Sequence, residues 1–144
     1  MQDHIYDGSR NLVLHLGTDF SASRVCIEKQ AKNLMDFQLP DNEGNQPKGK
    51  KIDKEKKPDH ILVCKINTSA VCAGLREKQH NCAESQDAGG YICNYIYYSS
   101  MMTMAYVDNA DVVFIHVPSF ATIRKEKQLA CVLEFLKKWI LMEI

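Results

Sequence analysis

The sequence has no excess of charge of either sign, no long apolar run and no apolar stretch at its start. Its 18 basic and 18 acidic residues balance, which gives no support for a nucleic-acid or membrane-surface partner. No segment approaches the roughly 18 consecutive apolar residues of a membrane-spanning helix. The first residues are polar and lack the apolar core of a signal peptide. We therefore expect a cytoplasmic protein that binds neither nucleic acid nor membranes.

The six cysteines include no Cys-x-x-Cys pair, and this absence argues against a zinc knuckle or a thioredoxin-type redox site. They are Cys26, Cys64, Cys72, Cys82, Cys93 and Cys131. In a cytosolic domain of this size they are expected to stay reduced. Most of them are expected to be small buried apolar residues, and one needs a chemical explanation.

The 144 residues predict a single domain, residues 1–144, of ordinary globular composition. Residues 11–17 are mostly apolar, which predicts a strand buried on both faces as in a parallel sheet. Residues 40–59 are rich in proline, glycine, asparagine and aspartate, which predicts a surface loop. We interpret the lysines from 48 to 57 as a solvated, mobile stretch.

The remaining pattern alternates strands and helices. Short strands are expected at residues 61–64 and 82–85 and a long one at 111–118. Helices are expected at 68–78, capped by Thr68 or Ser69, and at 91–105, where the composition predicts burial. A third helix over 125–142 carries a stripe predicted to face the core, made of Leu129, Val132, Leu133, Leu136, Trp139 and Ile140. This order predicts an α/β fold, a three-layer α/β/α sandwich with a mostly parallel sheet.

Ligands of such sheets bind beyond the carboxyl ends of the strands. That rule selects the turn at residues 86–90 and the strand end at His116. Cys93 follows this turn in the first turn of a helix, where unpaired N–H groups and partial positive charge favour a thiolate. The same N–H groups could receive an oxyanion. The alternative is an inert thiol buried on a helix.

His116 lies in an apolar strand, where an unpaired imidazole is costly to bury. It is therefore either a satisfied core histidine or the base that activates a thiol. A third group, normally a carboxylate, should orient such a base. The spacing alone leaves this group open among Glu28, Asp36, Asp41, Glu43 and Asp87.

The chain resembles the pyroglutamyl peptidase I family of cysteine peptidases in several segments that occur in the same order. They are Val25–Asn33, Leu39–Pro47, and Ser85–Tyr98 followed by Phe114–Pro118. The resemblance implies that Cys93 is the nucleophile, His116 the general base and Glu28 the acid that orients it. It implies hydrolysis of N-terminal pyroglutamate from peptide substrates, with no metal and no other cofactor.

The chain also departs from the family pattern. The family begins with a strand and turn of roughly Gly-Phe-Gly-Pro-Phe that helps to hold the pyrrolidone ring, and this N-terminal strand section is lacking here. Cys26 stands where the family has serine or threonine, and Gln38 replaces an arginine. These departures keep a second hypothesis open, a catalytically dead relative with a structural or binding role. A redox or metal protein is a third and weaker hypothesis. The sequence indicates no oligomeric state.

Overall fold

The computed structural model describes residues 9–142. Its elements follow in the order β1 (Asn11–Thr18), β2 (Val25–Glu28), β3 (Gln30–Lys32), β4 (Ile61–Val63), α1 (Thr68–Glu77), β5 (Cys82–Ser85), α2 (Ile92–Met104), β6 (Ala110–Val117) and α3 (Lys125–Leu141). One sheet has the strand order β1-β6-β2-β5, while β3 and β4 pair separately. β1 is parallel to β6 and β2 to β5, whereas β2 and β6 are antiparallel. The mostly parallel sheet is therefore confirmed.

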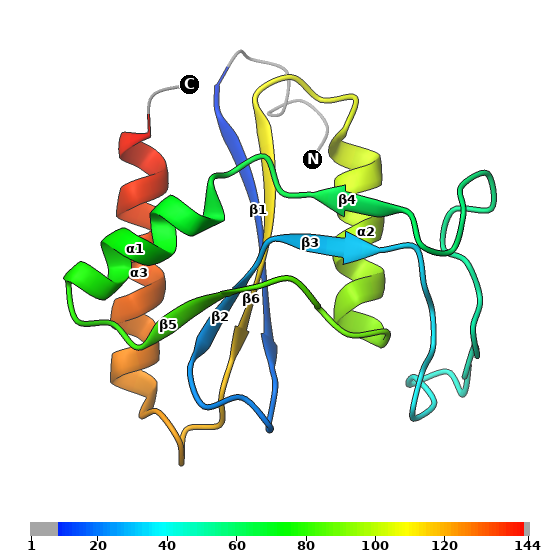
Figure 1. Ribbon diagram of the computed structural model, residues 1–144, viewed down its shortest axis with the longest axis horizontal. Coiled ribbons are helices and arrows are strands. Elements are labelled where there is room, and N and C mark those ends of the chain that lie inside the picture. The colour runs from blue at the N-terminus through cyan, green and yellow to red at the C-terminus, as the bar shows by residue number, and fades with distance from the viewer. Residues whose placement is uncertain (1–8, 143–144) are drawn as a thin grey trace.

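Helices cover both faces of the sheet, which confirms the three-layer arrangement (Figure 1). α2 lies on one face, and α1 and α3 lie on the other. The sequence of β6 is mostly apolar because both faces of this strand are buried. Val113 and Ile115 pack into the core under α1 and α3, while Val112 and Phe114 pack into the core under α2.

β1 occupies the edge of the sheet, and the prediction that it is buried on both faces is only partly right, because Leu12 and Leu14 pack against one core and Val13 packs against the other. Within residues 9–142 it pairs only with β6. Its side chains are half-buried at most, and Leu16 is 55% exposed. An apolar run predicts a strand, but the number of neighbours of that strand depends on the topology of the whole sheet.

Two predictions about the helices are wrong, namely the residue that caps α1 and the side of α3 that faces the core. Asn67 caps α1, in place of Thr68 or Ser69, because its side-chain oxygen accepts a hydrogen bond from the N–H of Ala70 at 3.0 Å. The buried face of α3 is also rotated from the predicted stripe. Three predicted core residues are exposed, namely Leu129, Leu133 and Ile140.

The buried face of α3 includes a polar residue, Gln128, that does not belong to the predicted apolar stripe. Gln128 is buried together with Cys131 and Phe135. Its side-chain amide donates hydrogen bonds to the carbonyl oxygens of Pro118 at 2.7 Å and Ile123 at 2.8 Å. These bonds satisfy the buried amide and hold the segment between β6 and α3.

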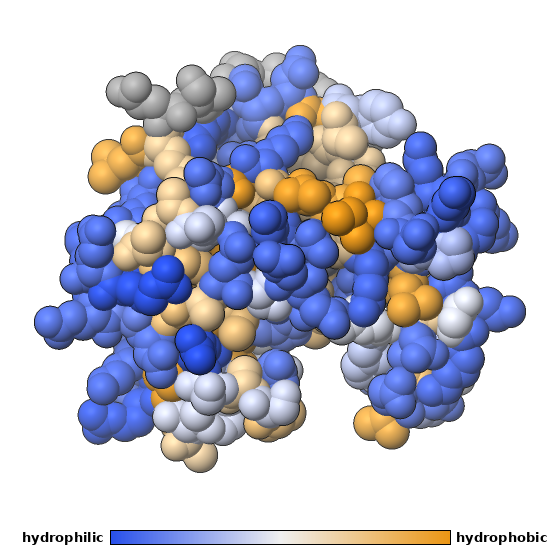
Figure 2. Space-filling view, viewed as in Figure 1, coloured by the Kyte–Doolittle hydropathy of each residue, from blue (hydrophilic) through white to orange (hydrophobic). Residues whose placement is uncertain are grey.

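α2 is apolar around most of its circumference, but it is buried on one side only. Four large side chains remain exposed, namely Ile92, Tyr95, Ile96 and Met102. A second apolar surface lies over β4, where Ile61 and Val63 are exposed (Figure 2). The predicted burial of this helix is therefore only partly right.

The segment at residues 40–59 contains no helix or strand, as predicted, but its second half is held by one buried side chain. Asn33 accepts hydrogen bonds from the backbone N–H groups of Ile52 at 2.8 Å and Asp53 at 2.7 Å. Its amide donates to the carbonyl oxygens of Asp53 at 2.8 Å and Lys57 at 3.0 Å. The lysine side chains are mostly exposed, while the backbone beneath them is fixed to the body of the domain.

Replacing Asn33 with alanine is expected to loosen this segment. The change leaves partly buried backbone groups of Ile52 and Asp53 without this partner, which should lower the free energy of unfolding by about 1–3 kcal/mol. Urea denaturation measures that loss, and limited trypsin digestion should cut faster among the lysines from 48 to 57. Asn45→Ala is the matched control, since Asn45 is exposed. Equal digestion rates in the two variants would contradict the anchoring role.

Candidate active site

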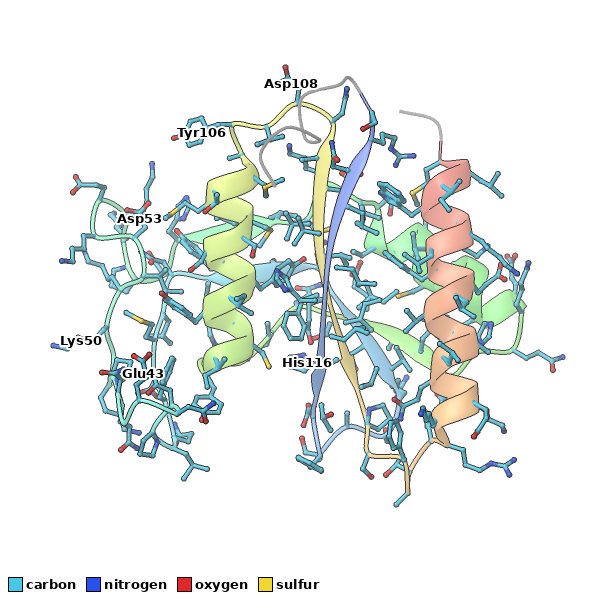
Figure 3. All side chains as sticks on the ribbon, turned by 180° about the vertical axis from the view of Figure 1, so that it is seen from behind. Glu43, Lys50, Asp53, Tyr106, Asp108 and His116 are labelled. Carbon is cyan, nitrogen blue, oxygen red and sulfur yellow. The ribbon has the colours of Figure 1, made fainter. Side chains whose placement is uncertain are left out.

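A buried carboxylate–imidazole pair joins β2 and β6. The Nδ1 atom of His116 lies 2.7 Å from Oε1 of Glu28, and the two residues are only 8% and 2% exposed. The antiparallel register of β2 and β6 places both side chains on the face that α2 covers. In Figure 3, His116 lies near the carboxyl end of β6, level with the first turn of α2. Distant parts of the sequence therefore meet where the strand-end rule predicts a ligand site.

The pair changes the acid–base properties of the imidazole. Burial by itself lowers the pKa of His116, but hydrogen bonds to Cys93 and Glu28, together with the charges of those groups, outweigh it. The net effect raises the pKa from 6.5 to about 9. The charge of His116 also contributes to the lowered pKa of Asp19. The hydrogen bond from Ser21 to Asp19 lowers that pKa more strongly. The imidazole is therefore held in its protonated form at neutral pH.

Cys93 is the second residue of α2, and it lies close enough to His116 to contribute to the raised pKa of the imidazole. Tyr91 occupies the N-cap position without a capping side-chain bond. Within the described residues, the backbone N–H of Cys93 has no hydrogen-bond acceptor. A free N–H at the start of a helix can stabilise negative charge on the sulfur or on an adjacent oxyanion.

Asn94 fixes the first turn of α2 against β3, a role that the sequence analysis missed. The side chain is fully buried and bonds to the backbone of Lys32 through both its oxygen, at 3.0 Å, and its nitrogen, at 2.9 Å. It also donates to the carbonyl oxygen of Leu34 at 3.0 Å. The sequence does show an asparagine directly after Cys93. The backbone groups to which Asn94 bonds are distant in the sequence, so its role could not be predicted.

Tyr97 contacts the backbone of Glu28, and the sequence analysis did not predict this role either. Its hydroxyl donates to the backbone carbonyl of Glu28 at 2.8 Å, and its ring packs against Phe114. The second carboxylate oxygen of Glu28, Oε2, is buried without a hydrogen-bond partner among the described residues. The carboxylate therefore depends on the His116 cation to offset its burial.

The other carboxylates left open by the spacing have different partners. Asp41 accepts from the N–H groups of its own turn, including that of Asn45 at 2.8 Å. Asp87 forms an exposed ion pair with Lys32 at 3.0 Å, and Asp36 accepts from the N–H of Gly49 at 3.3 Å. Glu43 is exposed in the 40–59 segment. Of the five candidates, Glu28 is the one that contacts His116.

The model for the pyroglutamyl peptidase family matches residues 1–134 of this sequence. The chain belongs to the pyroglutamyl peptidase family. A pyrrolidone-carboxylate peptidase of Yersinia pestis is 32% identical over 108 residues, which cover 74% of this chain and 49% of that protein. The chain thus spans about half the length of the curated relatives that it matches.

Solved structures agree with this family assignment. The pyrrolidone carboxyl peptidase of Thermus thermophilus is 27% identical, with a TM-score of 0.76 over 88% of this chain and 68% of that one. Pyroglutamyl peptidase I of Bacillus amyloliquefaciens superposes with a TM-score of 0.82 over 92% of this chain and 67% of that one. At 20% identity, the second likeness shows the fold alone.

The four cysteines that pack in the cores, Cys64, Cys72, Cys82 and Cys131, are buried as predicted. Cys26 is only half-buried, and it lies directly across from His116 in the β2–β6 register. Burial, followed by the charge of Glu28, raises the pKa of the Cys26 thiol. Cys26 is therefore a poorer nucleophile than an ordinary thiol at neutral pH.

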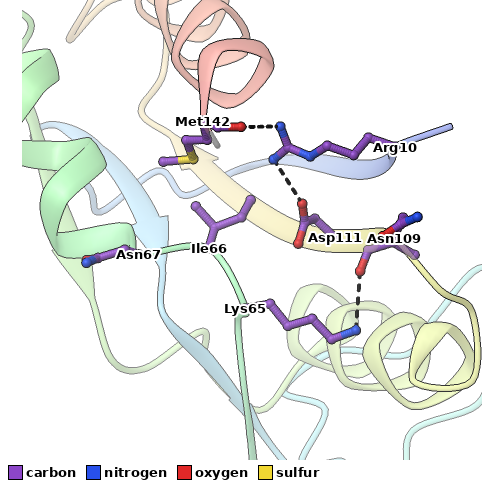
Figure 4. A pocket seen from close by; sticks show the side chains of 8 residues that line it. Arg10, Lys65, Ile66, Asn67, Asn109, Asp111 and Met142 are labelled. Atoms are coloured by element: carbon purple, nitrogen blue, oxygen red, sulfur yellow. Dashed lines mark hydrogen bonds and ion pairs between the residues drawn. The ribbon is translucent and has the colours of Figure 1, made fainter. Parts of the chain in front are cut away.

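A cavity of about 470 Å³ lies at the opposite end of β6, next to Ala110 (Figure 4). Arg10 lines it and donates hydrogen bonds to the carbonyl oxygens of Trp139 at 2.8 Å and Met142 at 2.9 Å. The same guanidinium stacks over the Trp139 ring and reaches Asp111. Its polar groups satisfy the C-terminal end of α3, so we assign this region of the pyroglutamyl peptidase fold a structural role.

Among residues 9–142, no group of three or more histidine, cysteine, aspartate and glutamate side chains is arranged to hold a metal ion. None of α1, α2 and α3 combines the length and the apolar character needed to cross a membrane.

Proposed function

We propose that this member of the family is a cysteine peptidase that removes pyroglutamate from the N-terminus of peptides. The observation that supports the proposal most strongly is the 2.7 Å contact between Glu28 and His116. Cys93 lies close enough to His116 to contribute to the raised pKa of the imidazole. Carboxylate, imidazole and thiol in this order can activate the sulfur and hold the imidazole in one orientation.

Each residue then has a defined role. The Cys93 thiolate attacks the carbonyl carbon that joins pyroglutamate to the next residue, and the electron pair of the carbonyl moves onto oxygen. His116 protonates the amine as the peptide bond breaks, which leaves an acyl-enzyme at Cys93. Water then attacks the acyl-enzyme while His116 accepts its proton, which releases pyroglutamate and restores the Cys93 thiolate beside the protonated imidazole. Glu28 keeps the imidazole oriented and stabilises its positive charge.

A fluorescence assay tests this proposal. The protein should release aminomethylcoumarin from its pyroglutamyl conjugate, and it should leave the prolyl conjugate intact, because proline has the ring but lacks the lactam carbonyl. The difference in kcat/KM should be at least about 10⁴-fold, the discrimination expected when buried polar groups in a site lose their partner. Equal turnover of both conjugates, or of neither, would reject the substrate assignment.

A non-catalytic binding protein remains the second candidate function. One observation favours it, since α2 leaves four large side chains exposed, namely Ile92, Tyr95, Ile96 and Met102, and an exposed apolar patch is typical of an interaction surface. A folded, monodisperse protein whose Cys93 is alkylated no faster than an ordinary cysteine would favour this alternative. Rapid alkylation of Cys93 together with pyroglutamyl turnover would reject it.

The substrate partners in this proposal are pyroglutamyl peptides, and the proposed setting is the cytoplasm. Six unpaired thiols among the described residues are compatible with a reducing compartment.

A further inference from the structure

Gly17 lies beside the candidate nucleophile in a position that no motif assigned. It is opposite His116 in the parallel β1–β6 register, while Cys26 is opposite His116 on the other side. A row of three residues thus crosses β1, β6 and β2 under the start of α2. Gly17 is the member of this row that contributes no side chain.

The space above Gly17 is filled by two groups from the site. A Cβ atom at this position would lie 3.0 Å from the sulfur of Cys93 and 2.7 Å from the ring of Phe114. The second distance is shorter than real Cβ atoms essentially ever approach a neighbour. A methyl group here must therefore displace the sulfur, the ring or the strand.

The ring of Phe114 has little freedom to give way. It is buried, and its centroid lies 4.6 Å from that of His116 and 5.9 Å from that of Tyr97. Moving this ring also moves the imidazole or the residue that supports Glu28. The thiol is the less constrained neighbour, because Cys93 is only partly buried.

We propose that Gly17 is a positioning residue for Cys93. Its missing side chain lets the sulfur rest against β1, within hydrogen-bonding reach of His116. The expected effect on catalysis rests on the proposed function. The contact between residue 17 and the sulfur can be tested without any substrate.

The catalytic consequence predicts a selective effect on kcat. Gly17→Ala should lower kcat for the pyroglutamyl conjugate by about 100-fold, the loss expected when a reacting group is displaced by an ångström. KM should change by no more than about threefold, because the change alters the chemical step and not the binding of the substrate. Alkylation of Cys93 by iodoacetamide, followed by mass spectrometry, should slow in parallel.

Gly74→Ala is the matched control for this variant. A Cβ atom at Gly74 on α1 would meet the end of the Lys138 side chain at 2.7 Å, a flexible group that can move aside. This glycine-to-alanine change lies on the other face of the sheet, and it should leave both kcat and the alkylation rate unchanged.

A double-mutant cycle separates a role toward the sulfur from general packing. The urea midpoint of Gly17→Ala should shift downward, and that shift should be at least halved when Cys93 is already alanine, because the sulfur is no longer in the way. If Gly17→Ala fails to fold alone and folds together with Cys93→Ala, the proposal is supported. Equal shifts in both backgrounds, or two unfolded variants, would assign the collision to Phe114 and overturn it.

The proposed function and the positioning role of Gly17 can be rejected independently of each other. If the wild-type protein does not turn over the pyroglutamyl conjugate, the proposed function fails while the urea cycle still decides whether Gly17 places the sulfur. If the wild type is active and Gly17→Ala matches it in kcat, the positioning role is rejected and the peptidase assignment stands.

Discussion

Replacing Cys93 with alanine is expected to reduce kcat/KM for the pyroglutamyl conjugate by at least about 10⁴-fold, because the covalent step has no other nucleophile in place. Alanine keeps the helix and removes only the sulfur. The protein should stay folded, since Cys93 is partly exposed at the first turn of α2. Circular dichroism and urea denaturation check the fold, and coumarin release measures the loss.

Cys26→Ser is the control for this experiment. Cys26 is the other half-buried thiol, and serine keeps its size and its capacity to hydrogen-bond to the carbonyl oxygen of Arg24. The burial that raises the pKa of the Cys26 thiol argues against attack by this residue. Turnover should therefore persist in Cys26→Ser and be absent in Cys93→Ala. The reverse result would move the nucleophile to β2, and equal turnover would exclude both thiols.

Replacing Glu28 with glutamine is expected to reduce kcat/KM by about 10⁴-fold, by analogy with the amide substitution of the orienting acid in the serine triad. The glutamine oxygen can still accept the hydrogen bond that Nδ1 of His116 gives to Oε1. The substitution therefore removes the negative charge with little change in shape. It also places an amide N–H₂ where the unpaired Oε2 atom lies, a buried donor without a partner.

The pH dependence should move in a defined direction. In the wild type, burial lowers the pKa of His116, but the hydrogen bonds and charges of Cys93 and Glu28 raise it by a larger amount. The resulting pKa is about 9. Without the charge of Glu28, burial remains and the pKa should fall by more than about one unit. The alkaline limb of kcat/KM, measured from about pH 5 to pH 10, should shift to lower pH by the same amount.

Stability should show the same linkage. Because folding raises the pKa of His116 from 6.5 to about 9, the stabilisation is complete below the lower value and is lost as the pH rises through the higher one. The free energy of unfolding of the wild type should therefore decrease across this interval more steeply than that of Glu28→Gln. Glu84→Gln is the control, since Glu84 bonds to Thr68 on the other face of the sheet. An alkaline limb that stays in place in Glu28→Gln would contradict the pairing.

Local pattern identified most of the elements because each has a periodicity or a turn that can be seen in the residues themselves. The strand at His116, the long C-terminal helix and the 40–59 surface segment all lie close to their predicted bounds. The errors concern which side of an element is covered. β1 is an edge strand, and the buried face of α3 turns toward Gln128 and away from Leu129. Such features depend on what packs alongside, which periodicity does not encode.

The sequence by itself determined the kinds of chemical groups available, the order of strands and helices, and the likeness that singled out Cys93, His116 and Glu28. Only the tertiary structure decided which carboxylate contacts the imidazole, because residues 28 and 116 meet through strand pairing across 88 positions. It also decided that Gly17 leaves room for the sulfur, since empty space beside an atom is a property of packing. Residue types are local information, whereas contacts depend on the fold of the whole chain.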